Sequence, residues 1–200
     1  MFIDKPITVD EDDAVAFMRA CRAAGVRLTG GSSCVHAEEV QRLRAAREQN
    51  EGGRTLGGIV RGPIDLESRY GGFWFYAQHV TEILCEIFGR YPTSILACER
   101  QDAITAVFRY PDYDATAFFA DHSYVYAATR FSEEGNAGGV FPITGGSNCF
   151  RTEFDEFYRL LSGGEPRLPA EDLIAPVFAM SAIVRSLASG KEEPVHSFKI

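Results

Sequence analysis

The sequence predicts an α+β fold, in which an open, largely antiparallel sheet has helices packed on one face and follows a short strand-helix-strand unit. Three observations predict it: the strand-helix-strand pattern of residues 2–29, a strongly apolar helix over residues 72–88, and strand-like alternation across residues 94–131. The 200 residues are 46% hydrophobic and 24% charged, which is ordinary globular composition and suffices for one good-sized core.

The first unit begins with a short apolar strand, Phe2-Ile3, and continues into a helix whose start carries the capping-box pattern Thr8-x-x-Glu11. Gly25 predicts the end of this helix, because glycine readily adopts the left-handed conformation that closes helices. A second strand is expected over residues 26–29, leading into a turn at residues 30–33. This order is typical of a parallel βαβ unit.

A polar surface helix is expected next, over about residues 35–49, followed by a strand near residues 56–60. The helix over residues 72–88 ends at Gly89 and carries an apolar stripe at helical spacing, so it should form the centre of the core. The stripe consists of Phe73, Tyr76, Ala77, Val80, Ile83, Leu84 and Ile87.

Residues 94–131 are expected to form a meander of three or four antiparallel strands. A glycine-rich loop at residues 135–139 and a short strand at residues 140–143 should extend the sheet. Two helices, over about residues 149–162 and 170–189, are expected to end the chain.

The strands expected within residues 103–131 are not strongly polar on either face. A sheet with helices on one side normally exposes a charged opposite face, so this second face is expected to be covered as well. The sequence therefore predicts a homodimer, or a larger homo-oligomer, that assembles through the open sheet face.

Composition disfavours several classes of function. The net charge of −8, without a basic run, argues against nucleic acid or an anionic membrane as partner. The N-terminus lacks the regions of a signal peptide, which predicts a cytoplasmic protein, and the apolar stretch at residues 173–184 is too short to span a bilayer. Five cysteines without a C-x-x-C pair predict free thiols and no metal site.

Lys5 is the first candidate for a functional side chain, because it follows a short strand and precedes Pro6, whose ring restrains the backbone on both sides. A lysine at the carboxyl end of a strand in an open α/β sheet points toward the crevice where ligands bind. The alternative is a solvated lysine in a turn.

His79 is the second candidate, since it lies beside the apolar stripe of its helix and shares a face with Glu82 and Glu86. A carboxylate one turn away can orient an imidazole and raise its pKa, as a general base near neutral pH requires. The alternative is an ordinary surface ion pair at i,i+3 spacing.

Two glycine-rich segments could suggest phosphate binding. Gly135-x-x-Gly138-Gly139 lacks the preceding strand, following helix and trailing acid of the dinucleotide motif, so a hairpin loop is expected there. The turn at residues 30–33 precedes a helix and could hold an anion at the helix N-terminus, although a glycine-rich turn alone is a weak pattern.

The order of these features is more specific than any of them alone, and it resembles the glucose-fructose oxidoreductase and inositol dehydrogenase family (Gfo/Idh/MocA) from residue 2 to about residue 196. The features that carry the resemblance are, in order, Asp4-Lys5-Pro6, a capped helix, Gly25-Val26 and a strand, Gly71-Gly72-x(6)-His79-x-x-Glu82-x(6)-Gly89, an antiparallel sheet and Ser186-x-x-x-Gly190.

The resemblance implies a division of the chain into two parts. Residues 1–33 would be the remnant of a nucleotide-binding Rossmann domain, and residues 34–200 the C-terminal α/β domain that binds substrate and oligomerises. The family's cofactor is NAD or NADP, and its substrates are small polyols and sugars.

The resemblance also implies site residues. Lys5, with Pro6, would lie beside the nicotinamide and the substrate, although Asp4 stands where the family usually has glutamate. His79 would take the hydroxyl proton, and Glu82 would orient His79.

The sequence departs from the family pattern in three further places. Phe75 stands where many of these dehydrogenases have an aspartate four residues before the histidine, and Cys34 stands where a polar residue is often found. The unit with the G-x-G-x-x-G turn, which holds the pyrophosphate of the cofactor, is missing. NAD or NADP binding is therefore expected only when an N-terminal part is supplied.

Two hypotheses of function follow. In the first, the chain is the substrate-side portion of an NAD(P)-dependent oxidoreductase that acts on a sugar, cyclitol or related hydroxyl/carbonyl compound, and it is inactive alone. In the second, it is a non-catalytic binding or oligomerisation module of the same fold, which Phe75, Cys34 and the missing turn favour.

Overall fold

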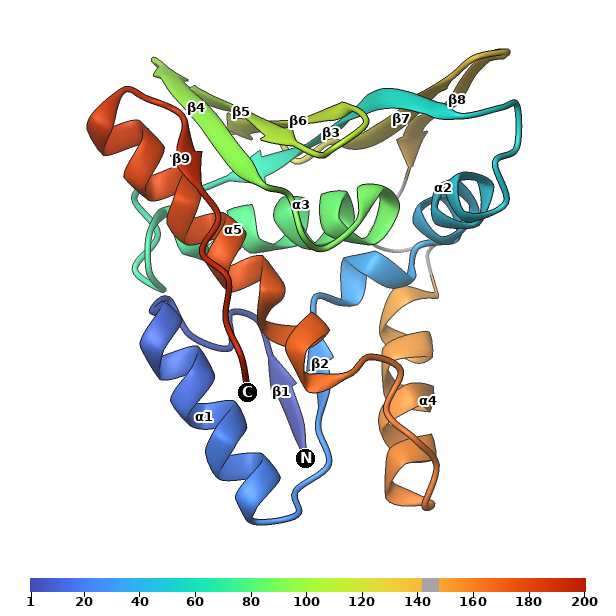
Figure 1. Ribbon diagram of the computed structural model, residues 1–200, viewed down its shortest axis with the longest axis vertical. Helices are drawn as coiled ribbons and strands as arrows, with labels where there is room; N and C mark the ends of the chain where they lie inside the picture. The colour runs from blue at the N-terminus through green and yellow to red at the C-terminus, as the bar shows by residue number, and fades with distance from the viewer. Residues whose placement is uncertain (142–147) are drawn as a thin grey trace.

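The computed structural model describes residues 1–141 and 148–200, and Figure 1 shows how their helices and strands are arranged. The predicted βαβ unit is confirmed: β1 (Phe2–Asp4) and β2 (Thr29–Gly31) are parallel, and α1 (Glu11–Ala23) connects them. Together they form the lower part of the molecule in Figure 1.

Both boundaries inside this unit differ from the expectation. The second strand runs through the two glycines that were expected in a turn, because a Cβ at Gly30 would lie 1.8 Å from the carbonyl oxygen of Ile3 and would prevent the pairing with β1. The cap of α1 is Asp10, whose carboxylate accepts a hydrogen bond from the backbone N–H of Asp13 at 2.9 Å. The capping box expected from Thr8 is therefore wrong by two residues.

A seven-stranded sheet forms the upper part of the molecule, with the strand order β8-β7-β3-β6-β5-β4-β9 (Figure 1). Its strands are β3 (Thr55–Ile64), β4 (Ser94–Arg100), β5 (Ala103–Arg109), β6 (Asp114–Asp121), β7 (Tyr126–Ser132), β8 (Gly135–Phe141) and β9 (Glu193–Pro194). β4, β5 and β6 form the antiparallel meander that was predicted. β7 does not follow β6, because β3 lies between them, parallel to β6 and antiparallel to β7.

The glycine-rich segment that was expected to be a loop is the edge strand β8. It pairs with β7 along its whole length, and a Cβ at Gly138 would lie 2.0 Å from the carbonyl oxygen of Ala128. Glycine at this position allows the backbone to approach the neighbouring strand closely, and it does not mark a loop. Residues 142 and 143 of the expected strand lie outside the described residues.

Helices cover one face of the sheet (Figure 1). The helical elements after α1 are the 3₁₀ turn η1 (Ser33–His36), α2 (Glu38–Glu48), α3 (Phe73–Phe88), α4 (Cys149–Leu161) and α5 (Ala170–Ser189). The single helix expected over residues 35–49 is divided into η1 and α2, because Ala37 has an extended backbone, with a ψ of 137°. α3, α4 and α5 match their predicted ranges within one residue.

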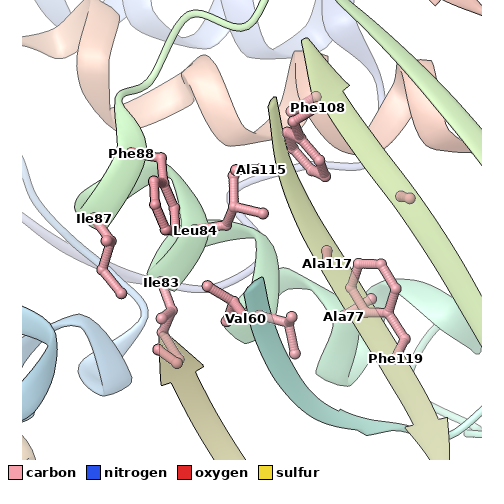
Figure 2. Packing of buried hydrophobic residues seen from close by; sticks show 14 of the residues in the cluster. Val60, Ala77, Ile83, Leu84, Ile87, Phe88, Phe108, Ala115, Ala117 and Phe119 are labelled. Carbon is pink, nitrogen blue, oxygen red and sulfur yellow. The ribbon is translucent and has the colours of Figure 1, made fainter. Parts of the chain in front are cut away.

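The core lies between α3 and the sheet, and Figure 2 shows its packing. Ile83, Leu84 and Phe88 of α3 meet β3 and β6, where the small side chains of Ala115 and Ala117 leave room for them. Each fully buried side chain of this size contributes roughly 1.5–3 kcal/mol of transfer free energy. The predicted stripe is confirmed at Ala77, Val80, Ile83, Leu84 and Ile87, all of which are buried.

The opposite face of the sheet has no helix over it in the described part of the chain (Figure 1). Ile59, near the middle of β3, is 42% exposed there, and its register partners are Thr116 on β6 and Thr129 on β7. The predicted fold class, an open and largely antiparallel sheet with helices on one face behind a strand-helix-strand unit, is thus confirmed.

A second cluster of buried side chains joins the start of α5 to α1. It includes Met18 and Cys21 of α1 and Ile174 and Phe178 of α5. The apolar stretch expected to be too short for a bilayer is part of α5, which by length and composition could cross a membrane. However, 61% of its apolar window is buried inside the fold, which is typical of a core helix. The division at residue 33 stays a prediction.

Candidate functional site

A pocket of about 1030 Å³ opens where the βαβ unit meets the large sheet. The end of β1, the turn after β2, the first turns of α3, the segment before β7 and the start of α4 all contribute to it. Its lining residues are Phe2, Asp4, Lys5, Ser33, Cys34, Phe75, Tyr76, His79, Tyr124, Val125, Tyr126, Val140, Phe150 and Glu153. Two of the predicted catalytic residues, Lys5 and His79, therefore share one pocket.

Lys5 reaches into this pocket from the carboxyl end of β1, and its peptide bond to Pro6 is cis. Its ammonium group donates a hydrogen bond to the carbonyl oxygen of Phe75 and lies 3.9 Å from the centre of the Phe75 ring. Burial lowers the pKa of Lys5, which outweighs the nearby charge of Asp4. Lys5 is therefore a partly desolvated cation and not a solvated turn lysine, while Pro6 is absent from the lining.

His79 lies on the second turn of α3 and faces the same pocket. Its Nδ1 atom is 2.6 Å from the hydroxyl oxygen of Ser32, in the turn after β2. Burial lowers the pKa of His79 to about 3, and the charge of Lys5 acts in the same direction. The imidazole is consequently neutral at physiological pH, which is opposite to the raised pKa that the sequence pattern suggested.

Glu82 is buried one turn further along α3, and its carboxylate holds the turn after β2. It accepts a hydrogen bond from the backbone N–H of Ser32 at 2.8 Å and another from the side-chain amide of Gln78 at 2.9 Å. A Cβ at Gly31 would lie 2.7 Å from its Oε2 atom. Glu82 thus acts on His79 through Ser32, and the direct orientation that the resemblance implied is replaced by this indirect one.

Backbone N–H groups at the turn of residues 30–33 already donate hydrogen bonds to other groups of the protein. The N–H of Ser32 donates to Glu82, and the N–H of Cys34 donates to the Ser32 hydroxyl at 3.2 Å. Two of the groups that could have held an anion are therefore engaged. Burial also raises the pKa of the Cys34 thiol to about 12, so it is an unreactive thiol.

Glu86 belongs to a separate cluster about two turns beyond His79 on α3. Its carboxylate is bound by Arg44 at 2.8 Å, by Arg167 at 2.6 Å, by Gln41 and by Arg90. Burial would raise the pKa of Glu86, but the three arginines outweigh it and lower the pKa to about 2. His79, Glu82 and Glu86, which were predicted to share one helix face, therefore contact different parts of the fold.

The aromatic wall and one acid of the pocket were not predicted. Tyr76 was expected in the core, yet it lies at the pocket, where its ring meets Phe75 at 4.8 Å and Tyr124 at 5.6 Å between ring centres. Helical spacing could not separate it from the core stripe, because the pocket and the core lie on adjoining faces of α3. Glu153 also lines the pocket, and nothing in the sequence around it distinguishes it from the other acids of α4.

The pocket fits one end of a nicotinamide cofactor and not the other. Phe75, Tyr76 and Tyr124 offer flat apolar surfaces, and Lys5 offers a donor beside them. No matching site for the pyrophosphate is found at the turn of residues 30–33, whose backbone N–H groups are engaged, and the sequence contains no G-x-G-x-x-G turn. Among the described residues no group of three or more His, Cys, Asp or Glu side chains could hold a metal ion.

No family model and no curated protein matches this sequence, whereas many solved structures match its fold. A probable dehydrogenase from Thermotoga maritima is 14% identical, with a TM-score of 0.83 over 97% of this chain and 73% of that chain. The apo scyllo-inositol dehydrogenase from Lactobacillus casei is 14% identical, with a TM-score of 0.80 over 98% of this chain and 72% of that chain.

The same Lactobacillus casei enzyme with bound NAD(H) and scyllo-inositol is 14% identical, with a TM-score of 0.78 over 98% of this chain and 73% of that chain. Identities this low establish the fold alone. The chain therefore has the fold of the C-terminal part of the Gfo/Idh/MocA oxidoreductases, as its order of motifs indicated.

Proposed function

We propose that this chain is the substrate-side portion of an NAD(P)-dependent oxidoreductase that acts on a sugar, cyclitol or related hydroxyl/carbonyl compound. The observation that carries the proposal is the convergence of Lys5 and the neutral ring of His79 on one aromatic-walled pocket. The match in fold to an enzyme that binds NAD(H) and scyllo-inositol supports the choice of cofactor and substrate class.

In this proposal Lys5 donates a hydrogen bond to the reacting oxygen of the substrate. Its positive charge stabilises the negative charge that grows on this oxygen as the hydroxyl loses its proton. His79 contacts the same hydroxyl as a neutral hydrogen-bonding group, and Ser32 and Glu82 fix the position of its ring. A nicotinamide bound beside Lys5 and Pro6 would supply the oxidising or reducing equivalent.

We further propose that an N-terminal nucleotide-binding half completes the site. One face of α4 carries four large apolar side chains at helical spacing, and each is more than 60% exposed: Phe150, Phe154, Tyr158 and Leu161. A contiguous apolar stripe of this kind is typical of a surface that another domain covers. The helix that carries it lies beside the β1–β2 sheet, since Phe2 of β1 and Phe157 of α4 are in ring contact at 5.6 Å.

The second candidate function is a non-catalytic module of the same fold. The observation that favours it is Phe75, whose ring lies under Lys5 in place of an aspartate that could relay a proton. A module of this kind would keep the pocket for binding and the open sheet face for assembly, without turnover.

Calorimetry of cofactor binding, together with an assay of polyol oxidation, separates these candidates. The isolated chain is expected to show no saturable binding of NADH or NADPH below the millimolar range, because its sequence lacks the G-x-G-x-x-G turn that holds the pyrophosphate. Joined to a nucleotide-binding half, in fusion or as a second chain, it should bind the cofactor and reduce it with a polyol. Cofactor binding without any polyol turnover would favour the module, and micromolar cofactor affinity of the isolated chain would contradict the proposal.

A further inference from the structure

The pocket shared by Lys5 and His79 receives apolar side chains from the large sheet. Val125 stands directly before β7, and Val140 lies on β8. They are 42% and 76% exposed, and both line the pocket, so their apolar surface is open to a ligand. We call these two valines, together with Tyr76 of α3 and Tyr124, the apolar wall.

Tyr76 connects the apolar wall to the two reactive side chains. The ammonium nitrogen of Lys5 lies 5.6 Å from the centre of the Tyr76 ring, and the His79 ring lies 6.3 Å from it between ring centres. Tyr124 meets Tyr76 edge-on, with 5.6 Å between the ring centres and 77° between the ring planes. The wall therefore begins directly beside Lys5 and His79.

Tyr124 is held in place although its side chain is open to the pocket. It is 65% exposed, and it belongs to the short connection between β6 and β7. Arg61 of β3 fixes this connection on both sides of Tyr124, because it donates to the carbonyl oxygen of Val125 at 2.8 Å and to the hydroxyl of Ser123 at 2.5 Å. An exposed ring on a fixed backbone is a preorganised contact for a ligand.

Several hydrogen-bonding groups of the pocket are already engaged. The carboxylate of Asp4 accepts from the backbone N–H of Lys5 at 2.8 Å, and the Lys5 ammonium donates to the carbonyl oxygen of Phe75. Nδ1 of His79 is paired with the Ser32 hydroxyl. A hydroxyl group that loses water without gaining a partner costs affinity, so an unsubstituted polyol is a poor match for the apolar wall.

The pocket is large enough for an extended substrate beside a nicotinamide. Its volume of about 1030 Å³ lies at the upper end of the range of about 300–1,000 Å³ that is typical of pockets for drug-sized ligands. A nicotinamide beside Lys5 and Pro6 reaches the pocket from β1. The part lined by the large sheet is thereby left to the substrate.

We propose that the apolar wall selects a substrate with a planar apolar group, such as an aromatic ring, attached near its reacting hydroxyl or carbonyl. The inference rests on the proposed function and names its substrate class: an aryl-substituted sugar or cyclitol in place of the unsubstituted polyol. The hydroxyl end meets Lys5 and His79, and the aryl group lies against Tyr76 and Tyr124. Tyr124 is then the specificity-determining residue, and Arg61 is a positioning residue that acts through it.

Binding to the isolated chain tests the apolar wall, since all four of its residues belong to this chain. Phenyl β-D-glucoside and methyl β-D-glucoside are matched probes, because they differ only in the group on the anomeric oxygen. In calorimetry the phenyl compound should bind about tenfold more tightly or better, since an aromatic ring gains from burial and from contact with other rings. Equal affinities, or no binding of the phenyl compound to the chain or to its assembly with a nucleotide-binding half, would overturn the inference.

Variants of the wall locate this preference. Tyr124→Ala should abolish it, and Tyr124→Phe, which keeps the ring, should retain it. Arg61→Lys, which removes the forked pair of donors, should reduce the preference without changing the affinity for the methyl compound. Tyr91→Ala is the control, because Tyr91 is 55% exposed and does not line this pocket. A preference that survives Tyr124→Ala, or that falls equally in Tyr91→Ala, would contradict the role of Tyr124.

Turnover by the assembled protein separates this inference from the proposed function. The phenyl compound should be oxidised with a kcat/KM about tenfold higher than the methyl compound, and Tyr124→Ala should raise its KM with little change in kcat. Oxidation of the methyl compound and of scyllo-inositol with equal efficiency overturns the substrate class and leaves the proposed function in place. Cofactor binding without oxidation of any of the three overturns the proposed function, together with the substrate class.

Discussion

The hydroxyl oxygen of Ser32 lies 2.6 Å from Nδ1 of His79, while the backbone N–H of the same serine donates to Glu82 at 2.8 Å. One residue of the turn after β2 thus connects the two residues of α3 that the sequence pairs by spacing. The connection also joins the βαβ unit to the pocket, so the orientation of the imidazole depends on how the two parts of the fold meet.

Ser32→Ala should release the His79 ring while leaving the backbone bond to Glu82 in place. The hydroxyl also accepts a hydrogen bond from the Cys34 N–H, so two hydrogen bonds are lost. We expect a loss of about 2 kcal/mol of unfolding free energy, at about 1 kcal/mol for each bond, and a change in the ¹⁵N shift of His79 Nδ1. Ser33→Ala, which removes the hydroxyl group of the neighbouring serine, is the control. Unchanged Nδ1 shifts in Ser32→Ala would mean that the serine does not hold the ring.

Glu86→Ala should strongly destabilise the protein. The change leaves the charges of Arg44, Arg90 and Arg167 around an empty, buried site, and breaking such a cluster typically costs 3–5 kcal/mol. Urea denaturation measures this loss. Glu48→Ala, which removes an exposed partner of Arg44, should cost at most about 1 kcal/mol, and equal losses in both variants would contradict the account.

His79 should make the fold less stable in mild acid. Its pKa in the folded chain, about 3, lies below its usual value of 6.5. Between these two pH values the unfolded chain therefore binds a proton at His79 that the folded chain does not bind. Its contribution to stability therefore falls as the pH drops from 6.5 toward 3. His79→Asn, which keeps a group opposite Ser32, should flatten this fall in thermal unfolding, whereas the exposed-residue control His122→Asn should not. Parallel curves for His79→Asn and wild type would exclude a buried neutral imidazole.

The uncovered sheet face should be an interface between two copies of the chain. Ile59, 42% exposed between Thr116 and Thr129, is expected at its centre. An obligate interface buries about 2,000 Å² or more, so light scattering should show a dimer or larger assembly at micromolar concentration. Ile59→Glu should convert it to monomer, while Val9→Glu, at an exposed apolar position outside the sheet, should not. A wild-type monomer at that concentration would refute the interface.

Much of the fold could be predicted from local patterns. The apolar period of α3 and the glycines that end α3 and α5 are strong signals, and these helices lie where expected. The position of β3 could not be predicted, because alternation indicates that a segment is a strand without indicating its neighbours. β8 was misassigned since its glycines serve close approach to β7, a tertiary requirement that resembles a loop in sequence.

The candidate site could be predicted only in part. Lys5 and His79 were identified by their places on elements, and both lie at the pocket. The roles around them depend on contacts between distant segments: Ser32 stands between Glu82 and His79, and Glu86 has partners from α2 and from the segment before α5. Glu153 is 148 residues from Lys5 in sequence, so only the fold could place both at one pocket.

The most direct test of the central claim is NAD(P)H formation by the chain joined to a nucleotide-binding half, measured by absorbance with a panel of cyclitols and sugars. Lys5 is the side chain to vary, because it alone supplies a cation beside the reacting oxygen in this account. We predict polyol-dependent reduction of the cofactor by wild type, a fall in kcat of roughly 10²-fold or more in Lys5→Ala, and partial recovery in Lys5→Arg. An assembly that binds the cofactor and turns over equally well with and without Lys5 would contradict the claim that this pocket is the site of oxidation.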